Sequence, residues 1–140
     1  MKANAKIPCY CIRLRRITHA VTQFYDTALS ASGLTVNQYS LLANLKWLGT
    51  SSMTDLAAQV GLDRSTVVRN LRPLFNLGYV EDSSSPETRN KAIFVTQSGS
   101  AVLETARPLW ERAQRNLTAI AGKEKLNELF DALAGIETPG

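Results

Sequence analysis

The sequence predicts a mainly α-helical fold with one small β-hairpin, and the hydrophobic pattern supports this in two ways. Apolar residues recur at three- and four-residue spacing through most of the chain, which is typical of amphipathic helices. The period changes after Gly78, where residues 79–82 and 91–95 are typical of two short strands joined by a polar loop. A chain of 140 residues can bury a core, so we expect a single domain over residues 1–140.

The predicted helices are bounded by capping residues and by glycines. A first helix covers about residues 8–31, and a second follows a capping box formed by Thr35 and Gln38. After the hairpin, two further helices cover about residues 97–134, with Gly122 between them. The residues beyond position 134 are expected to fray.

The strongest motif is a pair of short helices on either side of Gly61. The first covers about residues 53–60 after its cap Ser52, and the second covers about residues 64–77 after its cap Asp63. This geometry allows the second helix to lie in a DNA major groove while the first braces it. Seven apolar residues are expected to pack the two helices together: Leu56, Ala57, Val60, Leu62, Val67, Val68 and Leu71. Six polar or basic residues of the second helix are candidate DNA contacts: Arg64, Ser65, Thr66, Arg69, Asn70 and Arg72.

The polar loop of the hairpin adds two basic residues, Arg89 and Lys91, which can reach the DNA backbone or a narrow minor groove. The helix pair and the hairpin together predict a winged helix-turn-helix over about residues 35–96. A net charge of +4 suits a nucleic-acid partner but does not require one. The alternative is a winged-helix module that binds another protein and no DNA.

The order of these elements resembles the MarR family of bacterial transcription regulators over about residues 9–133. The resemblance rests on these segments: Leu56-Ala57, Asp63-Arg64-Ser65-Thr66-Val67, Arg69 and Leu77-Gly78-Tyr79-Val80. In the wing, the family has Asp-x-Arg followed by Leu-Thr-x-x-Gly, and this chain has Glu87-Thr88-Arg89 followed by Val95-Thr96-Gln97-Ser98-Gly99. The resemblance implies sequence-specific binding of double-stranded DNA at a palindromic operator, with repression as the family's usual outcome.

The resemblance also implies a homodimer, in which residues 8–31 and 97–134 form dimerisation helices that interlock with those of the partner. These helices look too apolar to be covered by one small winged unit. Seven side chains are expected to need covering by a partner: Leu103, Leu109, Trp110, Leu117, Leu126, Phe130 and Leu133. The alternative is that they pack around one core within the chain.

Two cysteines suggest how such a regulator senses a signal. Cys11 falls where the organic-peroxide-sensing branch of the family carries a reactive thiol, with Cys9 two residues before it. That branch uses two tyrosines to bond the thiolate, one of them from the partner subunit; Tyr25 is similar to one, and Tyr39 lies near the other position, which is Val36 here. The resemblance therefore implies a redox site at these residues, and the alternative is that both cysteines are structural.

A small-molecule effector is the family's commonest signal, and the resemblance places it between the dimerisation helices and the winged unit. Three aromatic residues are candidates for lining such a site, although core packing explains them equally well: Phe24, Tyr39 and Trp47.

Enzymatic and membrane functions are not indicated by the sequence. It has no glycine-rich phosphate loop, and its one histidine, His19, lies about 12 Å along the helix from Cys11, too far to share a metal ion. No apolar run approaches the ~18 residues of a membrane span, and no apolar signal core follows Met1. We therefore expect a cytoplasmic protein without cofactor, metal or catalytic residues.

Overall fold

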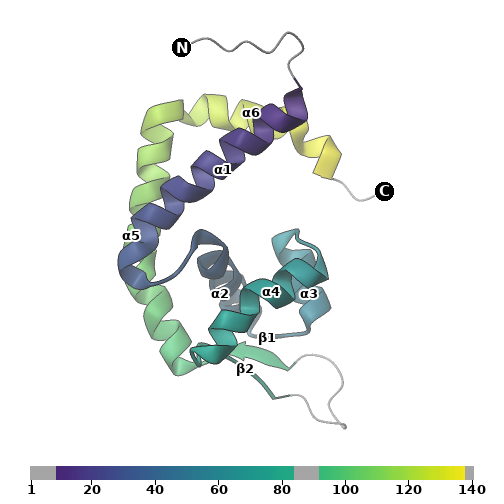
Figure 1. The fold of residues 1–140 in the computed structure, drawn as a ribbon, viewed down its shortest axis with the longest axis vertical. Coiled ribbons are helices and arrows are strands. Elements are labelled where there is room, and N and C mark those ends of the chain that lie inside the picture. Colours follow the sequence, from purple (N-terminus) through teal and green to yellow (C-terminus); the bar gives the residue numbers. More distant parts are fainter. Residues whose placement is uncertain (1–8, 84–91, 138–140) are drawn as a thin grey trace.

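The computed structural model describes residues 9–83 and 92–137, which form a winged unit at one end of the molecule and a helical arm at the other (Figure 1). The helices are α1 (Tyr10–Leu29), the short 3-10 helix η1 (Ser30–Ser32), α2 (Val36–Leu48), α3 (Met53–Val60), α4 (Arg64–Asn76), α5 (Gln97–Ala121) and α6 (Lys123–Glu137). The strands are β1 (Thr50–Ser51), β2 (Val80–Asp82) and β3 (Ile93–Val95). The predicted fold class, mainly helical with a small β element, is confirmed.

The helices begin at the capping residues that the sequence predicts. Thr35 and Gln38 form a reciprocal capping box at the start of α2. The side chains of Ser52, Asp63 and Thr96 each accept a hydrogen bond from a backbone N–H in the first turn of α3, α4 and α5. These bonds satisfy donors that have no partner inside the helix, so the caps set the helix starts locally.

The end of the last helix differs from the expectation. Fraying was expected beyond position 134, but α6 continues to Glu137. Gly135 alone costs a helix about 1 kcal/mol, which is not enough to end it, and the next helix-breaking residue in the sequence is Pro139.

The hydrophobic core lies where α2 meets α3, α4, α5 and the sheet. Its fully buried residues come from all of these elements and include Leu42, Leu45, Leu56, Leu71 and Leu74. The core also extends to α5, where Leu103 and Ala106 are buried within the chain. The expectation that Leu103 needs a partner subunit is therefore wrong, because α2 already covers it.

The sheet has three antiparallel strands in the order β1-β3-β2, so it extends the hairpin that the sequence predicts. Thr50 and Ser51 of β1 pair with Phe94 and Ile93 of β3. β1 was not predicted from the sequence, because a strand of two residues is too short to show a period of two.

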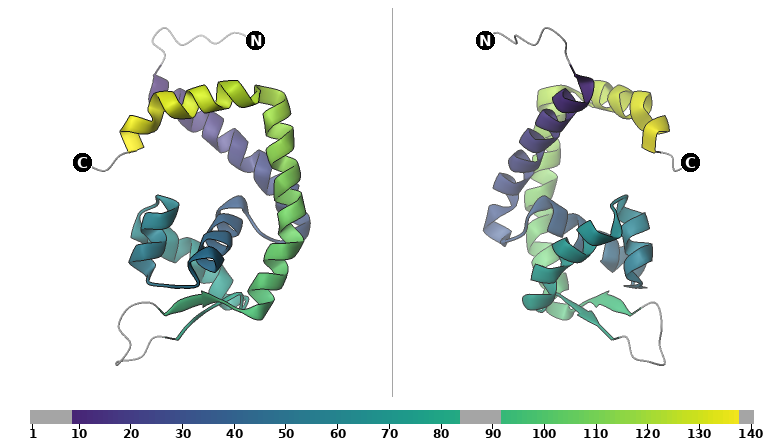
Figure 2. Two further views of the ribbon diagram at one scale, coloured as in Figure 1. Left: turned by 180° about the vertical axis from the view of Figure 1, so that it is seen from behind. Right: turned by 45° about the vertical axis from the view of Figure 1, so that its right-hand side comes forward.

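The helical arm consists of α1, the second half of α5 and α6 (Figure 2). α1 packs along α5, and the Tyr25 hydroxyl of α1 donates a hydrogen bond to the Gln114 side chain of α5. Large apolar side chains stay exposed on the arm: Tyr10, Ile12, Leu14, Ile17, Ile120, Leu129, Phe130 and Ile136. Across residues 9–83 and 92–137, no helix combines the length and apolar character that crossing a membrane requires.

Candidate nucleic-acid interface

A tight turn joins α3 to α4 and orients the two helices. Gly61 ends α3 with a φ of 71°, a left-handed conformation that glycine adopts without steric cost. The Leu62 N–H then donates to the Ala57 carbonyl at 3.1 Å, and Asp63 begins α4. Only three residues therefore separate the helices, which matches the predicted helix-turn-helix.

The inner side of α4 faces the core. Val67 and Leu71 are completely buried, and they pack in the same cluster as Leu56 and Ala57 of α3. Four of the seven predicted packing residues are thus confirmed as core, and Val60 is partly buried against them.

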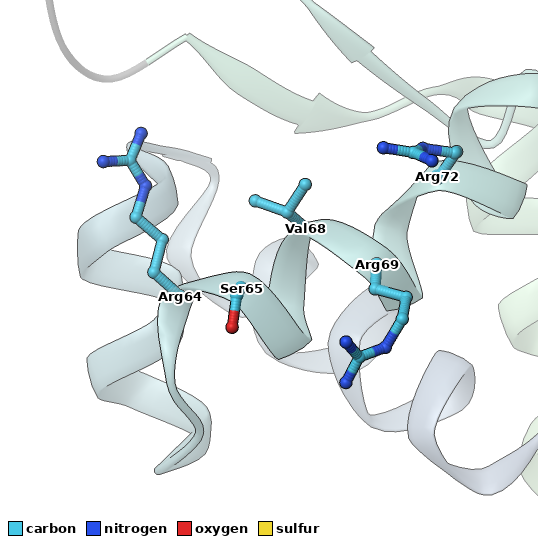
Figure 3. Close-up of a pocket in the computed structure, with 5 residues that line it drawn as sticks. All are labelled: Arg64, Ser65, Val68, Arg69 and Arg72. Atoms are coloured by element: carbon cyan, nitrogen blue, oxygen red, sulfur yellow. The ribbon is translucent and has the colours of Figure 1, made fainter.

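Two predicted packing residues lie elsewhere. The Leu62 side chain is 39% exposed because the turn lifts it away from the helix pair. Val68 is partly exposed and lies on the outer side of α4 among basic residues (Figure 3). Its position was predictable from helical spacing, because it lies four residues after Arg64 and four residues before Arg72.

The outer side of α4 forms a basic surface, which we call the α4 outer face. Its five residues line an open hollow of about 660 Å³: Arg64, Ser65, Val68, Arg69 and Arg72 (Figure 3). Within the part of the chain that the structure describes, no carboxylate forms an ion pair with any of the three arginines. Four of the six predicted α4 contacts therefore gather on one face, and its three arginines have no carboxylate partner among the described residues.

Asp63 organises the polar groups at the start of this face. Its carboxylate accepts hydrogen bonds from the Ser65 hydroxyl at 2.5 Å and from the Thr66 hydroxyl at 2.6 Å. The Thr66 N–H also donates to it, at 3.1 Å. These bonds, the one from Ser65 foremost, hold the pKa of Asp63 well below its usual range. The other two predicted α4 contacts, Thr66 and Asn70, do not line the hollow.

The base of the wing is fixed by hydrogen bonds to the turn that follows α4. The hydroxyls of Thr96 and Ser98 both donate to the Gly78 carbonyl, at 2.6 and 3.0 Å. The sequence left open which of these two residues caps α5, and the structure assigns the cap to Thr96. The predicted wing contacts Arg89 and Lys91 lie outside the described residues.

The four residues of the predicted redox site are not brought together within one chain. Cys9 and Cys11 are free, exposed thiols at the start of α1. Tyr25 lies fourteen residues further along, about 21 Å by helical rise, and its hydroxyl is bonded to Gln114. Tyr39 stacks on the ring of Trp110 at 5.5 Å, inside the core. Burial raises the pKa of both tyrosines.

The three candidate effector residues also occupy separate environments. The Phe24 ring lies nearly perpendicular to the Tyr25 ring, Tyr39 is buried, and the Trp47 side chain is 77% exposed. Among the residues described, no group of three or more histidine, cysteine or acidic side chains is placed to hold a metal ion.

Comparisons with known proteins agree with this geometry. The sequence profile of the MarR family matches residues 34–89. A comparison with curated proteins found no match. Solved structures do match: the transcriptional regulator MosR of M. tuberculosis, solved in complex with DNA, is 35% identical with a TM-score of 0.75. That alignment covers 94% of this chain and 100% of MosR.

Two Rhodococcus proteins are also similar. A MarR-family transcriptional regulator from Rhodococcus sp. RHA1 is 26% identical, with a TM-score of 0.72 over 97% of this chain and 99% of that protein. CouR from Rhodococcus jostii RHA1, solved with p-coumaroyl-CoA, is 25% identical, with a TM-score of 0.74 over 98% of this chain and 97% of CouR. The helix-turn-helix geometry, the family profile and the near-complete match to MosR lead to one conclusion: this chain belongs to the MarR family of transcriptional regulators.

Proposed function

We propose that this chain is a homodimeric repressor that inserts α4 of each protomer into the major groove of a palindromic operator. The α4 outer face is the observation that carries the proposal, because three arginines lie there without a carboxylate partner among the described residues. Arginines without a carboxylate partner can neutralise DNA phosphates and donate hydrogen bonds to guanine bases in the major groove. The structure of MosR in complex with DNA supports the same assignment by similarity.

The proposed DNA contacts come from α4 and from the wing. Arg64, Ser65, Arg69 and Arg72 contact DNA from the α4 outer face. Thr66 acts mainly through the cap that it forms with Asp63. Asn70 is proposed at the edge of the interface, and Arg89 and Lys91 are proposed to contact the backbone or minor groove from the wing.

The first test is DNA selection from random duplexes, followed by affinity measurements across salt concentrations. We expect a palindromic site whose half-sites lie about one helical turn apart. Arg69→Ala should weaken binding and reduce the salt slope by about one, because one phosphate contact is lost. Arg107→Ala is the matched control, since Arg107 lies on α5 and pairs with Glu104 at 2.6 Å.

A different result would favour the other function class. If no duplex is selected, or if Arg69→Ala and Arg107→Ala have the same salt slope as the wild type, DNA binding through α4 is contradicted. If no duplex is selected at all, the chain would instead act as a winged-helix module that binds another protein, with affinity independent of Arg64 and Arg69.

The proposed dimer uses the exposed apolar side chains of the helical arm. Phe130 is 61% exposed on α6, and Ile17 is 50% exposed on α1. Burial of such apolar surface against a second copy stabilises the dimer by about 25 cal/mol per Å². We expect a solution mass of twice the 15.4 kDa chain, reduced to one chain in Phe130→Asp. Trp47→Asp, which alters an exposed aromatic residue outside the arm, should leave the dimer intact.

The proposed signal is an oxidant acting on Cys11, with a small-molecule effector as the second candidate. The exposure of the thiol supports reaction with a peroxide: RSH and ROOH give RSOH and ROH. Peroxide should release the wild-type protein from its operator and leave Cys11→Ser bound, with Cys9→Ser as the control. Equal binding before and after peroxide treatment would make both cysteines structural and favour an effector. As an operator-binding regulator, the protein is proposed to act in the cytoplasm as one domain over residues 1–140.

A further inference from the structure

Val68 is an apolar side chain placed among polar ones on the α4 outer face. It lies between Arg64 and Arg72, each four residues away along the helix, and lines the same hollow (Figure 3). Its neighbour Val67 is completely buried and belongs to the core. Val68 keeps part of its surface exposed and is not one of the residues that pack against the core. Core packing therefore does not explain why an apolar residue occupies this position.

The surroundings of Val68 restrict what can cover it. Arginine guanidinium groups bind phosphates and guanine, but an anion alone leaves valine methyl groups without an apolar contact. Burying such methyl groups is favourable only against another apolar group. The hollow is therefore suited to a ligand that presents an apolar group beside acceptors and negative charge.

The DNA major groove offers this combination at one kind of base pair. Thymine exposes its C5-methyl group next to the O4 acceptor, whereas the groove edges of adenine, guanine and cytosine carry no methyl group. The phosphates on either side are within the reach of long arginine side chains.

Resting on the proposed function, we propose that Val68 is a specificity-determining residue that contacts the C5-methyl group of one thymine in each half-site. Arg64 and Arg72 hold the neighbouring phosphates or bases and so keep Val68 against that methyl group. The operator therefore requires thymine at this position for its methyl group and not for its hydrogen-bonding edge, which uracil shares.

The test replaces thymine by uracil in DNA selected by the wild-type protein. Each thymidine is changed to deoxyuridine in turn, at equivalent positions of both half-sites, which removes the methyl group and keeps base pairing. The Kd is measured at one fixed salt concentration for the wild type, Val68→Ala and Val102→Ala. Val102 is the control, because it is a partly buried valine of α5 that packs against the core.

At one position of each half-site, uracil should weaken wild-type binding about fourfold per methyl group, which corresponds to about 0.8 kcal/mol at about 1.4 kcal/mol per factor of ten. Substitution in both half-sites should then give about a 16-fold loss. Val68→Ala should bind the thymine and uracil duplexes equally at this position. Val102→Ala should keep the full loss.

Equal uracil penalties in the wild type and in Val68→Ala at every position would overturn the inference, as would a selected site without thymine. Both results still include sequence-selective binding, so they leave the proposed function standing. Absence of any selected site would instead contradict the proposed function itself, before any base is substituted. Thermal unfolding of Val68→Ala checks that the variant is folded, as expected for alanine at a partly exposed helical position.

Discussion

Gly99→Ala should destabilise the protein because the first turn of α5 lies directly against the chain before β2. A Cβ atom at Gly99 would be 2.1 Å from the Tyr79 carbonyl oxygen and 2.8 Å from the Val95 Cγ1 atom. The Tyr79 oxygen belongs to the backbone, so it cannot rotate away. The start of α5 must therefore move by on the order of 1 Å to restore ordinary contact distances.

The expected loss of stability can be estimated from the contacts and hydrogen bonds that this movement disturbs. Overpacking of a core typically costs about 1–3 kcal/mol. The movement also weakens the bond from the Thr96 N–H to the Tyr79 carbonyl and the two hydroxyl bonds to the Gly78 carbonyl, each with a net contribution of about 1 kcal/mol. Alanine regains about 1 kcal/mol through its helix propensity. We expect a net loss of about 3 kcal/mol, or about 10 °C in Tm.

The assay is thermal unfolding followed by far-ultraviolet circular dichroism, at equal protein concentrations because the Tm of a dimer depends on concentration. Gly135→Ala is the matched control, since a Cβ atom there has nothing within 4 Å and the residue is also helical. It should be neutral or stabilise the protein by up to about 1 kcal/mol. A Gly99→Ala protein as stable as Gly135→Ala would refute the packing argument.

Two further predictions concern pH. The pKa of Asp63 is lowered in the folded protein, so its stabilising effect is complete above its ordinary value of about 3.8 and is lost as the pH falls through the folded value. Asp63→Asn keeps a capping side chain but removes the titrating carboxylate, so its free energy of unfolding in urea should depend less on pH in acid. The same slope of unfolding free energy against acidic pH in the wild type and the variant would contradict this. Burial raises the pKa of Tyr39 above 10.0, so its neutral hydroxyl stabilises the fold below pH 10 and this effect is lost as the pH rises through the folded value. Tyr39→Phe should reduce the loss of stability at alkaline pH. The same loss in the variant and in the wild type would contradict a contribution from Tyr39 ionisation.

The sequence by itself determined the predicted helices, the helix-turn-helix and the three arginines of its basic face. Each of these depends on neighbours in the chain: Thr35, Ser52, Asp63 and Thr96 cap helices through bonds to the following turn. Gly61 provides the left-handed turn for the same local reason. The spacing of arginines along α4 places them on one face as soon as that helix forms.

Tertiary structure alone decided the features that depend on residues distant in the sequence. β1 exists because Thr50 and Ser51 meet β3, more than forty residues away, and two residues carry no strand signal of their own. The sequence also could not reveal that Gln114 and Trp110 are the partners of Tyr25 and Tyr39 within the chain. Local hydrogen bonds and helical periodicity can be read from a sequence, whereas burial is settled only when separate segments come together.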